Sequence, residues 1–161
     1  MNWQKLAFTD DLTGLWNTRA FYKLYKQEIE RAKRHKYSLV LVFLDLNRFK
    51  VVNDKYGHLA GDILLKKVSK QIVKELREYD NLFRLGGDEF IILLSHTDKI
   101  VAEEIMERIN QKIKKLLKIG LSYGIAEYIV DSRSKTKLIE IADQRMYKMK
   151  GKQNEEVESN I

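Results

Sequence analysis

The chain contains no cysteine and no proline among its 161 residues. The absence of cysteine excludes a disulfide framework and a thiolate metal site, and it fits a protein of the cytoplasm, where we expect this chain to lie. No apolar run approaches the roughly 20 residues that a membrane-spanning helix needs, and no signal peptide is visible. We therefore expect no membrane contact from this segment.

The composition is that of a folded domain with an excess of positive charge. Hydrophobic residues make up 44% of the chain and charged residues 33%, which suits one domain with a sizeable core. The net charge of +7 favours anionic partners such as nucleotides, nucleic acid or phosphate groups. A nucleic-acid-binding surface would need a basic stripe interleaved with exposed aromatic residues, which the sequence does not show. We therefore expect no nucleic acid among the partners.

The spacing of apolar residues predicts helices and strands that follow one another along the chain. The predicted helices cover residues 17–36, 49–55, 61–76, 99–118 and 138–149, and the predicted strands cover 37–46, 81–86, 88–94 and 119–129. A hairpin among helix-flanked strands favours an α+β fold with a central, largely antiparallel sheet and helices on its faces. We expect residues 1–9 to be a leader at the end of a linker, 10–150 to be the domain, and 151–161 to be a flexible tail.

Two carboxylates follow a pair of glycines between two strand-like runs. Gly86 and Gly87 predict a tight hairpin, because glycine adopts the backbone angles of a two-residue turn without penalty. Asp88 and Glu89 then enter the second strand with their side chains on opposite faces, so we do not expect them to share one role. Taken alone, this stretch also fits an ordinary polar hairpin tip.

A third carboxylate, Asp45, lies at the end of the predicted strand 37–46. A charge at that position is costly unless it has a partner or a function. If the two strand ends are neighbours in the sheet, Asp45 and Asp88 can bind a hard divalent cation such as Mg²⁺, with substrate phosphates completing the ligand shell. Lys50 and Lys150 are candidate cations for neutralising the phosphates.

Several segments together resemble the GGDEF family of diguanylate cyclases. Residues 84–90, Arg-Leu-Gly-Gly-Asp-Glu-Phe, resemble the signature of the family. The other matching segments are residues 11–17, 43–54, 57–62, 121–126 and 142–150, in the order of the family and within residues 10–150. The resemblance implies a polymerase-palm-like, nucleotidyl-cyclase-like fold for this catalytic domain. It also implies that two subunits meet as a transient homodimer and condense two GTP into cyclic di-GMP, with release of two pyrophosphates.

The resemblance further implies a role for each matching residue. Two Mg²⁺ ions, or Mn²⁺ in their place, would be held by Asp45, the Leu46 backbone carbonyl and Asp88. Asp88 or Glu89 would help to accept the proton of the attacking 3′-hydroxyl, and the choice between them stays open. The nucleotide would be bound by Asn53 and Asp62 at the guanine edge and, at the phosphates, by the backbone amides of Arg48, Phe49 and Lys50 with the side chains of Lys50 and Lys150.

Arg77 and Asp80 match the RxxD inhibitory motif of the family, at its usual distance before the glycine pair. The resemblance therefore implies product inhibition, with Arg77 contacting guanine and phosphate of cyclic di-GMP and Asp80 accepting from a guanine. By itself the motif also fits an ordinary i, i+3 ion pair at a helix end. The chain departs from the family pattern at Asn47, where an aspartate is usual. It departs again after Lys150, where Gly151-Lys152 follows immediately and leaves the role of Lys152 open.

Two other functions stay open beside the active cyclase. A catalytically silent module that only senses GTP or cyclic di-GMP would usually show erosion of the GGDEF residues, and residues 86–90 are intact. A cyclase with relaxed base choice is disfavoured by Asp62 at the guanine position. The short leader leads us to expect an N-terminal sensor domain in the full-length protein, and an isolated domain that dimerises weakly.

Overall fold

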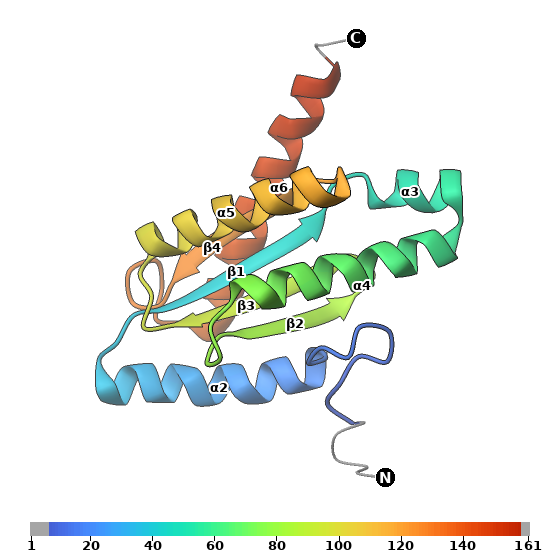
Figure 1. The fold of residues 1–161 in the computed structure, drawn as a ribbon. Coiled ribbons are helices and arrows are strands. Elements are labelled where there is room, and N and C mark those ends of the chain that lie inside the picture. Colours follow the sequence, from blue (N-terminus) through green and yellow to red (C-terminus); the bar gives the residue numbers. More distant parts are fainter. Residues whose placement is uncertain (1–6, 159–161) are drawn as a thin grey trace.

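The structure is a computed structural model that describes residues 7–158, with side chains described as far as Gln153. Helices and strands follow one another along this part of the chain as Figure 1 shows. The helices are α2 (Thr18–His35), α3 (Phe49–Tyr56), α4 (His58–Glu75), α5 (Lys99–Leu117) and α6 (Lys135–Glu158), and the strands are β1 (Leu39–Leu46), β2 (Asn81–Gly86), β3 (Glu89–Ser95) and β4 (Leu121–Glu127). No helix within the described residues is long and apolar enough to cross a membrane.

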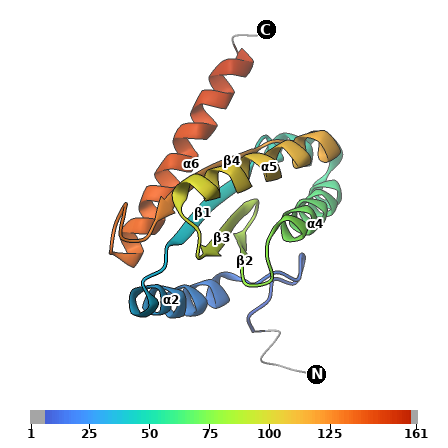
Figure 2. The same ribbon diagram turned by 60° about the vertical axis from the view of Figure 1, so that its left-hand side comes forward.

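The four strands form one antiparallel sheet in the order β2-β3-β1-β4. All residues of the central strand β1 are buried, and they alternate between the two faces. Val40, Val42 and Leu44 belong to the core that α4 and α5 cover, whereas Leu41 and Phe43 belong to the core that α2 and α6 cover. Figures 1 and 2 show these two helix pairs on opposite sides of the sheet. The predicted α+β fold with a largely antiparallel sheet is thus confirmed.

Local sequence explains where two of the long helices begin and end. The side chain of Asn17 accepts from the N–H of Ala20 at the start of α2, and that of Asp98 accepts from the N–H of Val101 at the start of α5. Such caps satisfy backbone donors that have no partner inside the helix. Basic residues occupy the last turn of both helices, where they complement the helix dipole. Both helices therefore lie close to their predicted positions.

The hairpin between β2 and β3 differs from the prediction by one residue. Its two turn residues are Gly87 and Asp88, because Gly86 still pairs with Glu89 across the ladder. The ladder shifts register between Arg84 and Gly86, so the strand carries an irregularity just before the turn. Gly86 and Gly87 both have positive φ, 147° and 51°, which glycine adopts most easily. Asp88 is therefore a turn residue, and Glu89 is the first residue of β3.

The prediction of a flexible tail over residues 151–161 is wrong for residues 151–158, which are helical. Helix α6 continues to Glu158, past Gly151, and Gln153 on it contacts residues at the ends of β1 and β4. A glycine weakens a helix by roughly 1 kcal/mol, which does not end the helix where tertiary contacts hold the following turn. The last three residues of the chain lie outside the described part.

The end of the predicted leader belongs to the fold. The side-chain amide of Asn17 donates to the carbonyls of Ala7 and Thr9, at 3.1 and 3.2 Å. Trp16 then forms a bridge to β2, and its carbonyl accepts from the N–H of Arg84 at 2.9 Å. This segment therefore covers the edge of β2, which would otherwise present unpaired backbone groups. The first six residues of the leader lie outside the described part of the chain.

Candidate functional site

Carboxylates from two neighbouring strands meet at one end of the sheet. Asp45, near the end of β1, lies directly opposite Glu89 at the start of β3. Opposite residues of an antiparallel pair share a face of the sheet, with Cβ atoms about 4.5–5.5 Å apart. Asp88 in the adjoining turn is close enough for its charge to raise the pKa of both groups. The structure therefore brings the three predicted carboxylates together, with Glu89 rather than Asp88 directly across from Asp45.

Asp45 is the most buried of these three residues, with 4% of its surface exposed. Burial raises the pKa of its carboxyl, the ammonium of Lys150 opposes this shift, and the charges of Asp88 and Asp143 add to it. Oδ2 accepts from Nζ of Lys150 at 2.5 Å, whereas Oδ1 is buried and accepts no hydrogen bond within the described structure. A buried carboxylate oxygen without a partner is costly, and a cation beside it would remove that cost. The residues present therefore fit a bound Mg²⁺.

Asp143 on α6 is a fourth carboxylate that the sequence did not single out as a site residue. It is exposed, and its charge raises the pKa of both Asp45 and Glu89, after the larger effect of burial on each. Among residues 7–158, no three His, Cys, Asp or Glu side chains are placed to hold a metal ion by themselves. Mg²⁺ is usually held by one or two carboxylates together with substrate phosphates. The cluster is therefore suited to an ion that arrives with a nucleotide.

Helix α6 brings Lys150 to Asp45 because β4 has no side chain at Gly124. A Cβ built on Gly124 would lie 1.9 Å from the carbonyl oxygen of Ala142 and 2.4 Å from the backbone nitrogen of Met146. The helix thus packs directly on the backbone of β4. Burial disfavours the ammonium of Lys150, but the hydrogen bond and the charge of Asp45 outweigh this effect and raise its pKa. A cation is therefore held at the strand ends where phosphates are expected.

Arg84 connects the hairpin turn with the N-terminal loop. Its guanidinium donates from Nε and Nη2 to the carbonyl of Gly87, at 3.0 and 2.8 Å, and from Nη1 to both oxygens of Asp10, at 3.0 Å each. Asp10 also accepts from the N–H and the hydroxyl of Thr13. Burial raises the pKa of Asp10, but the donors of Thr13 and Arg84 outweigh it and lower the pKa. The sequence assigned neither residue of this pair a role, and their only signal was their place in or beside matching segments.

The predicted guanine-binding residues come from α3 and the first turns of α4. Asn53 on α3 packs so closely against Gly61 that a Cβ there would lie 1.9 Å from its Oδ1. Asp62 is the next residue of α4, so its backbone adjoins the glycine that Asn53 packs against. Oδ1 of Asn53 is buried and has no hydrogen-bond partner within residues 7–158. An amide oxygen and a carboxylate are both suitable acceptors for N–H donors of a base.

The start of α3 presents backbone donors. Arg48 precedes the helix in the left-handed conformation, with φ of 58°, and its side chain makes no capping hydrogen bond. The amides of the first turn, including those of Phe49 and Lys50, therefore lack a side-chain cap partner. Such donors, with the positive end of the helix dipole, favour an anion. The predicted phosphate-binding amides thus lie directly after the strand that carries Asp45.

Arg77 and Asp80 lie in the turn between α4 and β2. Oδ2 of Asp80 accepts from the backbone N–H of Arg77 at 2.9 Å, and the guanidinium of Arg77 bonds to the hydroxyl of Tyr79 at 3.0 Å. In this part of the described structure the two side chains form no ion pair, so the helix-end ion pair considered as an alternative is absent. Burial raises the pKa of Asp80, and the Arg77 backbone and charge together with the backbone N–H of Ser95 oppose this shift. Oδ1 of Asp80 is buried and makes no hydrogen bond of normal geometry within residues 7–158. The turn therefore presents the exposed guanidinium of Arg77 beside Asp80.

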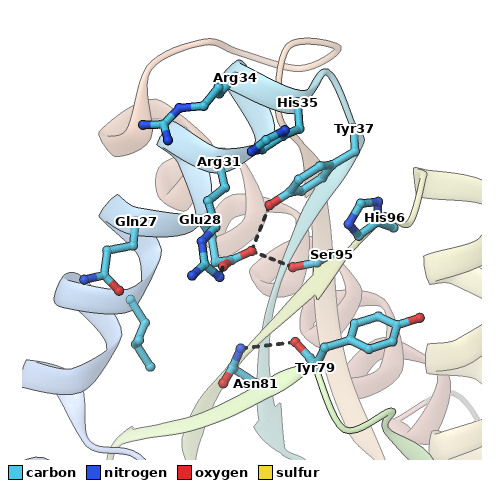
Figure 3. A pocket seen from close by; sticks show the side chains of 11 residues that line it. Gln27, Glu28, Arg31, Arg34, His35, Tyr37, Tyr79, Asn81, Ser95 and His96 are labelled. Carbon is cyan, nitrogen blue, oxygen red and sulfur yellow. Dashed lines mark hydrogen bonds and ion pairs between the residues drawn. The ribbon is translucent and has the colours of Figure 1, made fainter.

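A hollow of about 940 Å³ adjoins this turn (Figure 3). It reaches the turn at Tyr79 and is bounded on the other side by α2. Within it, Glu28 accepts from the hydroxyls of Tyr37 and Ser95, at 3.1 and 2.8 Å. The cationic or titratable residues that also line it are Arg31, Arg34, His35 and His96. The size and these groups are compatible with an anionic ligand of nucleotide size.

Comparisons with known proteins point to one family. The family model described as "Diguanylate cyclase, GGDEF domain" matches residues 7–156. Diguanylate cyclase DgcP of Pseudomonas aeruginosa is 36% identical over 152 residues, which cover 89% of this chain and 22% of that protein. Cyclic di-GMP phosphodiesterase PdeR of Escherichia coli is 40% identical over 152 residues, which cover 90% of this chain and 23% of that protein. The chain thus spans less than a quarter of either relative.

A solved structure shows the same fold. The crystal structure of the GGDEF domain of DgcB from Caulobacter crescentus, in complex with c-di-GMP, has a TM-score of 0.83 and 27% sequence identity to this chain. The match covers 89% of this chain and 90% of that one. The two folds are therefore similar over nearly the whole domain.

Proposed function

This chain belongs to the family of diguanylate cyclase GGDEF domains, and from that we propose that it condenses two GTP molecules into one cyclic di-GMP and two pyrophosphates. The observation that carries the proposal is the buried Oδ1 of Asp45, which has no hydrogen-bond partner within residues 7–158 and lies beside Glu89 and the Asp88 turn. A buried acceptor without a partner, next to two further carboxylates, suits the binding of a metal–nucleotide substrate better than a purely structural role.

The metal-binding part of the proposal rests on the family resemblance and on Asp45. Two Mg²⁺ ions, or Mn²⁺, would be held by Asp45, the Leu46 carbonyl and Asp88, and when bound they would neutralise the phosphates and activate the 3′-oxygen. Lys150 is already at Asp45, so its ammonium is placed to move onto a phosphate when the substrate enters. The amides at the start of α3 would bind the remaining phosphate oxygens.

Proton transfer is assigned to the carboxylates of the hairpin. In each half-reaction the 3′-oxygen of one GTP forms a bond to the α-phosphorus of the other, and the bond to the leaving pyrophosphate breaks. Asp88 or Glu89 accepts the hydroxyl proton. Burial and the neighbouring carboxylates raise the pKa of Glu89, so this carboxylate holds a proton more readily than a free glutamate does. Asn53 and Asp62 would fix the guanine by accepting from its N–H groups.

The reaction as proposed needs two copies of the chain. One site binds one GTP, so the attacking hydroxyl and the attacked phosphate come from two subunits of a transient homodimer. Turnover per mole of chain should then rise with enzyme concentration, because the fraction of dimer rises. A specific activity that is constant over a wide concentration range would contradict a weak dimer.

The first experiment is to incubate the purified chain with GTP and Mg²⁺ and to separate the nucleotides by chromatography, after bound product has been removed. We expect cyclic di-GMP and pyrophosphate from the wild type and none from Asp88→Ala. The matched control is Glu104→Ala, which removes an exposed carboxylate on α5 and should leave product formation unchanged. Untouched GTP with concentrated, product-free wild type would refute catalysis.

A silent binding module is the second candidate. PdeR, which carries a segment 40% identical to this chain, is named a cyclic di-GMP phosphodiesterase. A domain of this family can therefore occur in a protein that is named for the opposite reaction. If the chromatography shows no product, equilibrium dialysis with GTP and with cyclic di-GMP decides whether the domain binds either nucleotide. Binding without turnover would support the sensing module.

Feedback inhibition belongs to the same proposal. The exposed guanidinium of Arg77 can contact guanine and phosphate of cyclic di-GMP, and the carboxylate of Asp80 can accept from a guanine. The hollow beside Tyr79 gives space for a ligand of that size. The DgcB domain, with 27% identity, was solved in complex with c-di-GMP, which supports product binding by this fold.

The remaining parts of the proposal concern the whole protein. We expect the domain to work in the cytoplasm, where GTP is available. An N-terminal sensor domain is the expected source of regulation, and the small share of DgcP and PdeR that the chain covers is consistent with a domain that works inside larger proteins.

A further inference from the structure

The last turns of α6 contact the end of β1 at a second point beyond Lys150. The side-chain amide of Asn47 donates from Nδ2 to Oε1 of Gln153. The buried hydroxyl of Ser122 on β4 donates to Oδ1 of Asn47 at 2.5 Å and lies 3.3 Å from Oε1 of Gln153. Three polar side chains, from the residue after β1, from β4 and from α6, thus meet at one place. None of them has a role in the proposed reaction.

Asn47 joins two parts of the candidate site. It follows directly on β1, two residues after Asp45, and precedes Arg48 at the start of α3. Its backbone N–H donates to the carbonyl of Gly120 at 2.9 Å. Its side chain also packs against Gly120, since a Cβ built on that glycine would lie 3.1 Å from Nδ2 of Asn47. The residue is therefore fixed on both its backbone and its side chain. Anything attached to Asn47 is held in a defined position relative to Asp45.

Gly151 makes the end of α6 depend on such an attachment. It lies between Lys150 and Gln153, inside the helix, where glycine costs roughly 1 kcal/mol relative to alanine. Upstream of Lys150 the helix is held by its close packing on Gly124. Downstream, the contact of Gln153 with Asn47 is the next polar attachment to the sheet within the described side chains. Residues 150 and 153 are about one turn apart on the same helix face, and they contact Asp45 near the end of β1 and Asn47 just after it.

We infer that Gln153 is a positioning residue for Lys150: by bonding to Asn47 and Ser122 it keeps α6 helical across Gly151 and so holds the ammonium of Lys150 at Asp45. The inference rests on the proposed function, because the consequence of a misplaced Lys150 is weaker binding of the GTP phosphates. In this chain an amide pair thus anchors the helix at the position where the related family usually has an aspartate after β1.

The kinetic test uses Gln153→Ala, the double variant Gln153→Ala with Gly151→Ala, and Lys148→Ala as an exposed control on the same helix. Loss of one charge-assisted contact corresponds to about tenfold in affinity, so KM for GTP should rise about tenfold in Gln153→Ala while kcat changes much less. Alanine at 151 restores helix propensity and should recover most of that loss. Lys148→Ala should leave KM unchanged. An unrecovered KM in the double variant would overturn the inference, because a direct contact of Gln153 with GTP cannot be restored at position 151.

Hydrogen–deuterium exchange tests the attachment without reference to activity. Amides after Gly151 should exchange about tenfold faster in Gln153→Ala than in the wild type, and the double variant should exchange more slowly than the single one. Unchanged exchange in Gln153→Ala overturns the inference even if product is formed. If the wild type forms no product, the proposed function fails. The anchoring of α6 is still supported in that case if amides after Gly151 exchange faster in Gln153→Ala and more slowly again in the double variant.

Discussion

Removal of the Arg84 guanidinium should loosen the hairpin that carries Asp88 and Glu89. The side chain donates to the carbonyl of Gly87 in the turn and to the carboxylate of Asp10 in the N-terminal loop. In Arg84→Ala both acceptors lose these donors at once. We therefore expect a less stable domain and lower product formation per folded molecule.

The size of the effect follows from the burial of the pair. The side chains of Arg84 and Asp10 are 11% and 19% exposed, so water replaces the lost donors poorly. Hydrogen bonds to charged groups contribute about 1.5–3 kcal/mol each in such settings, and Asp10 keeps its bonds from Thr13. We expect Arg84→Ala to lower the free energy of unfolding by about 2–4 kcal/mol. Arg84→Lys keeps the charge but loses the planar fork, so about half of that loss should remain.

Urea denaturation followed by circular dichroism measures the free energy of unfolding. The control is Lys137→Ala, which breaks an exposed ion pair to Glu140 whose side chains are 58% and 51% exposed. Such a pair contributes at most about 1 kcal/mol. If Arg84→Ala were no less stable than Lys137→Ala, the role given to the guanidinium would be refuted.

The difference in the free energy of unfolding between the wild type and Arg84→Ala should also depend on pH, and its direction can be worked out. The pKa of Asp10 in the folded domain lies below its ordinary value of 3.8, despite the opposing effect of burial. Its contribution to stability is therefore complete above that value and is lost as the pH falls through the folded pKa. The difference in unfolding free energy between the wild type and Arg84→Ala should be constant from about pH 5 upwards and should narrow as the pH falls below the ordinary Asp pKa of 3.8.

Three further changes test other parts of the structure. Gly124→Ala would place a Cβ 1.9 Å from the backbone oxygen of Ala142, so α6 must shift, and urea denaturation should show a loss of about 3 kcal/mol or more. Asn17→Ala removes the cap of α2 and should cost about 1 kcal/mol in the same assay, with no change in KM for GTP. Arg77→Ala should raise the amount of cyclic di-GMP made before the reaction stalls, and an unchanged progress curve with product-free enzyme would count against the inhibitory site.

The sequence predicted the local elements well because they depend on neighbouring residues. Strand β1 is buried on both faces, so its sequence is a continuous apolar run without alternating polar residues. Asn17 caps α2 by accepting from the N–H of Ala20, three residues later. Both signals lie within a few residues of the element they define. The order of the elements and the α+β fold follow from such signals.

The hairpin and the end of α6 were predicted less well. Pairing of Gly86 with Glu89 places Asp88 in the turn, and that register depends on the bulge before it rather than on the glycines alone. Helix α6 passes Gly151 because Gln153 contacts Asn47, a residue more than 100 positions earlier. The amino-acid composition after Gly151 does not reveal that long-range contact, so the sequence favoured a flexible tail.

By itself, the sequence determined which residues can carry chemistry: Asp45 at a strand end, Asp88 and Glu89 after two glycines, and the motifs that resemble one family. The tertiary structure alone decided which of them meet. It placed Glu89 opposite Asp45 and brought Lys150 over Gly124 to the same carboxylate. It also left Oδ1 of Asp45 buried, with no hydrogen-bond partner in the part of the chain that the structure describes. The reason is physical: propensity and periodicity act over a few residues, whereas register and helix packing are set by contacts between segments far apart in the chain.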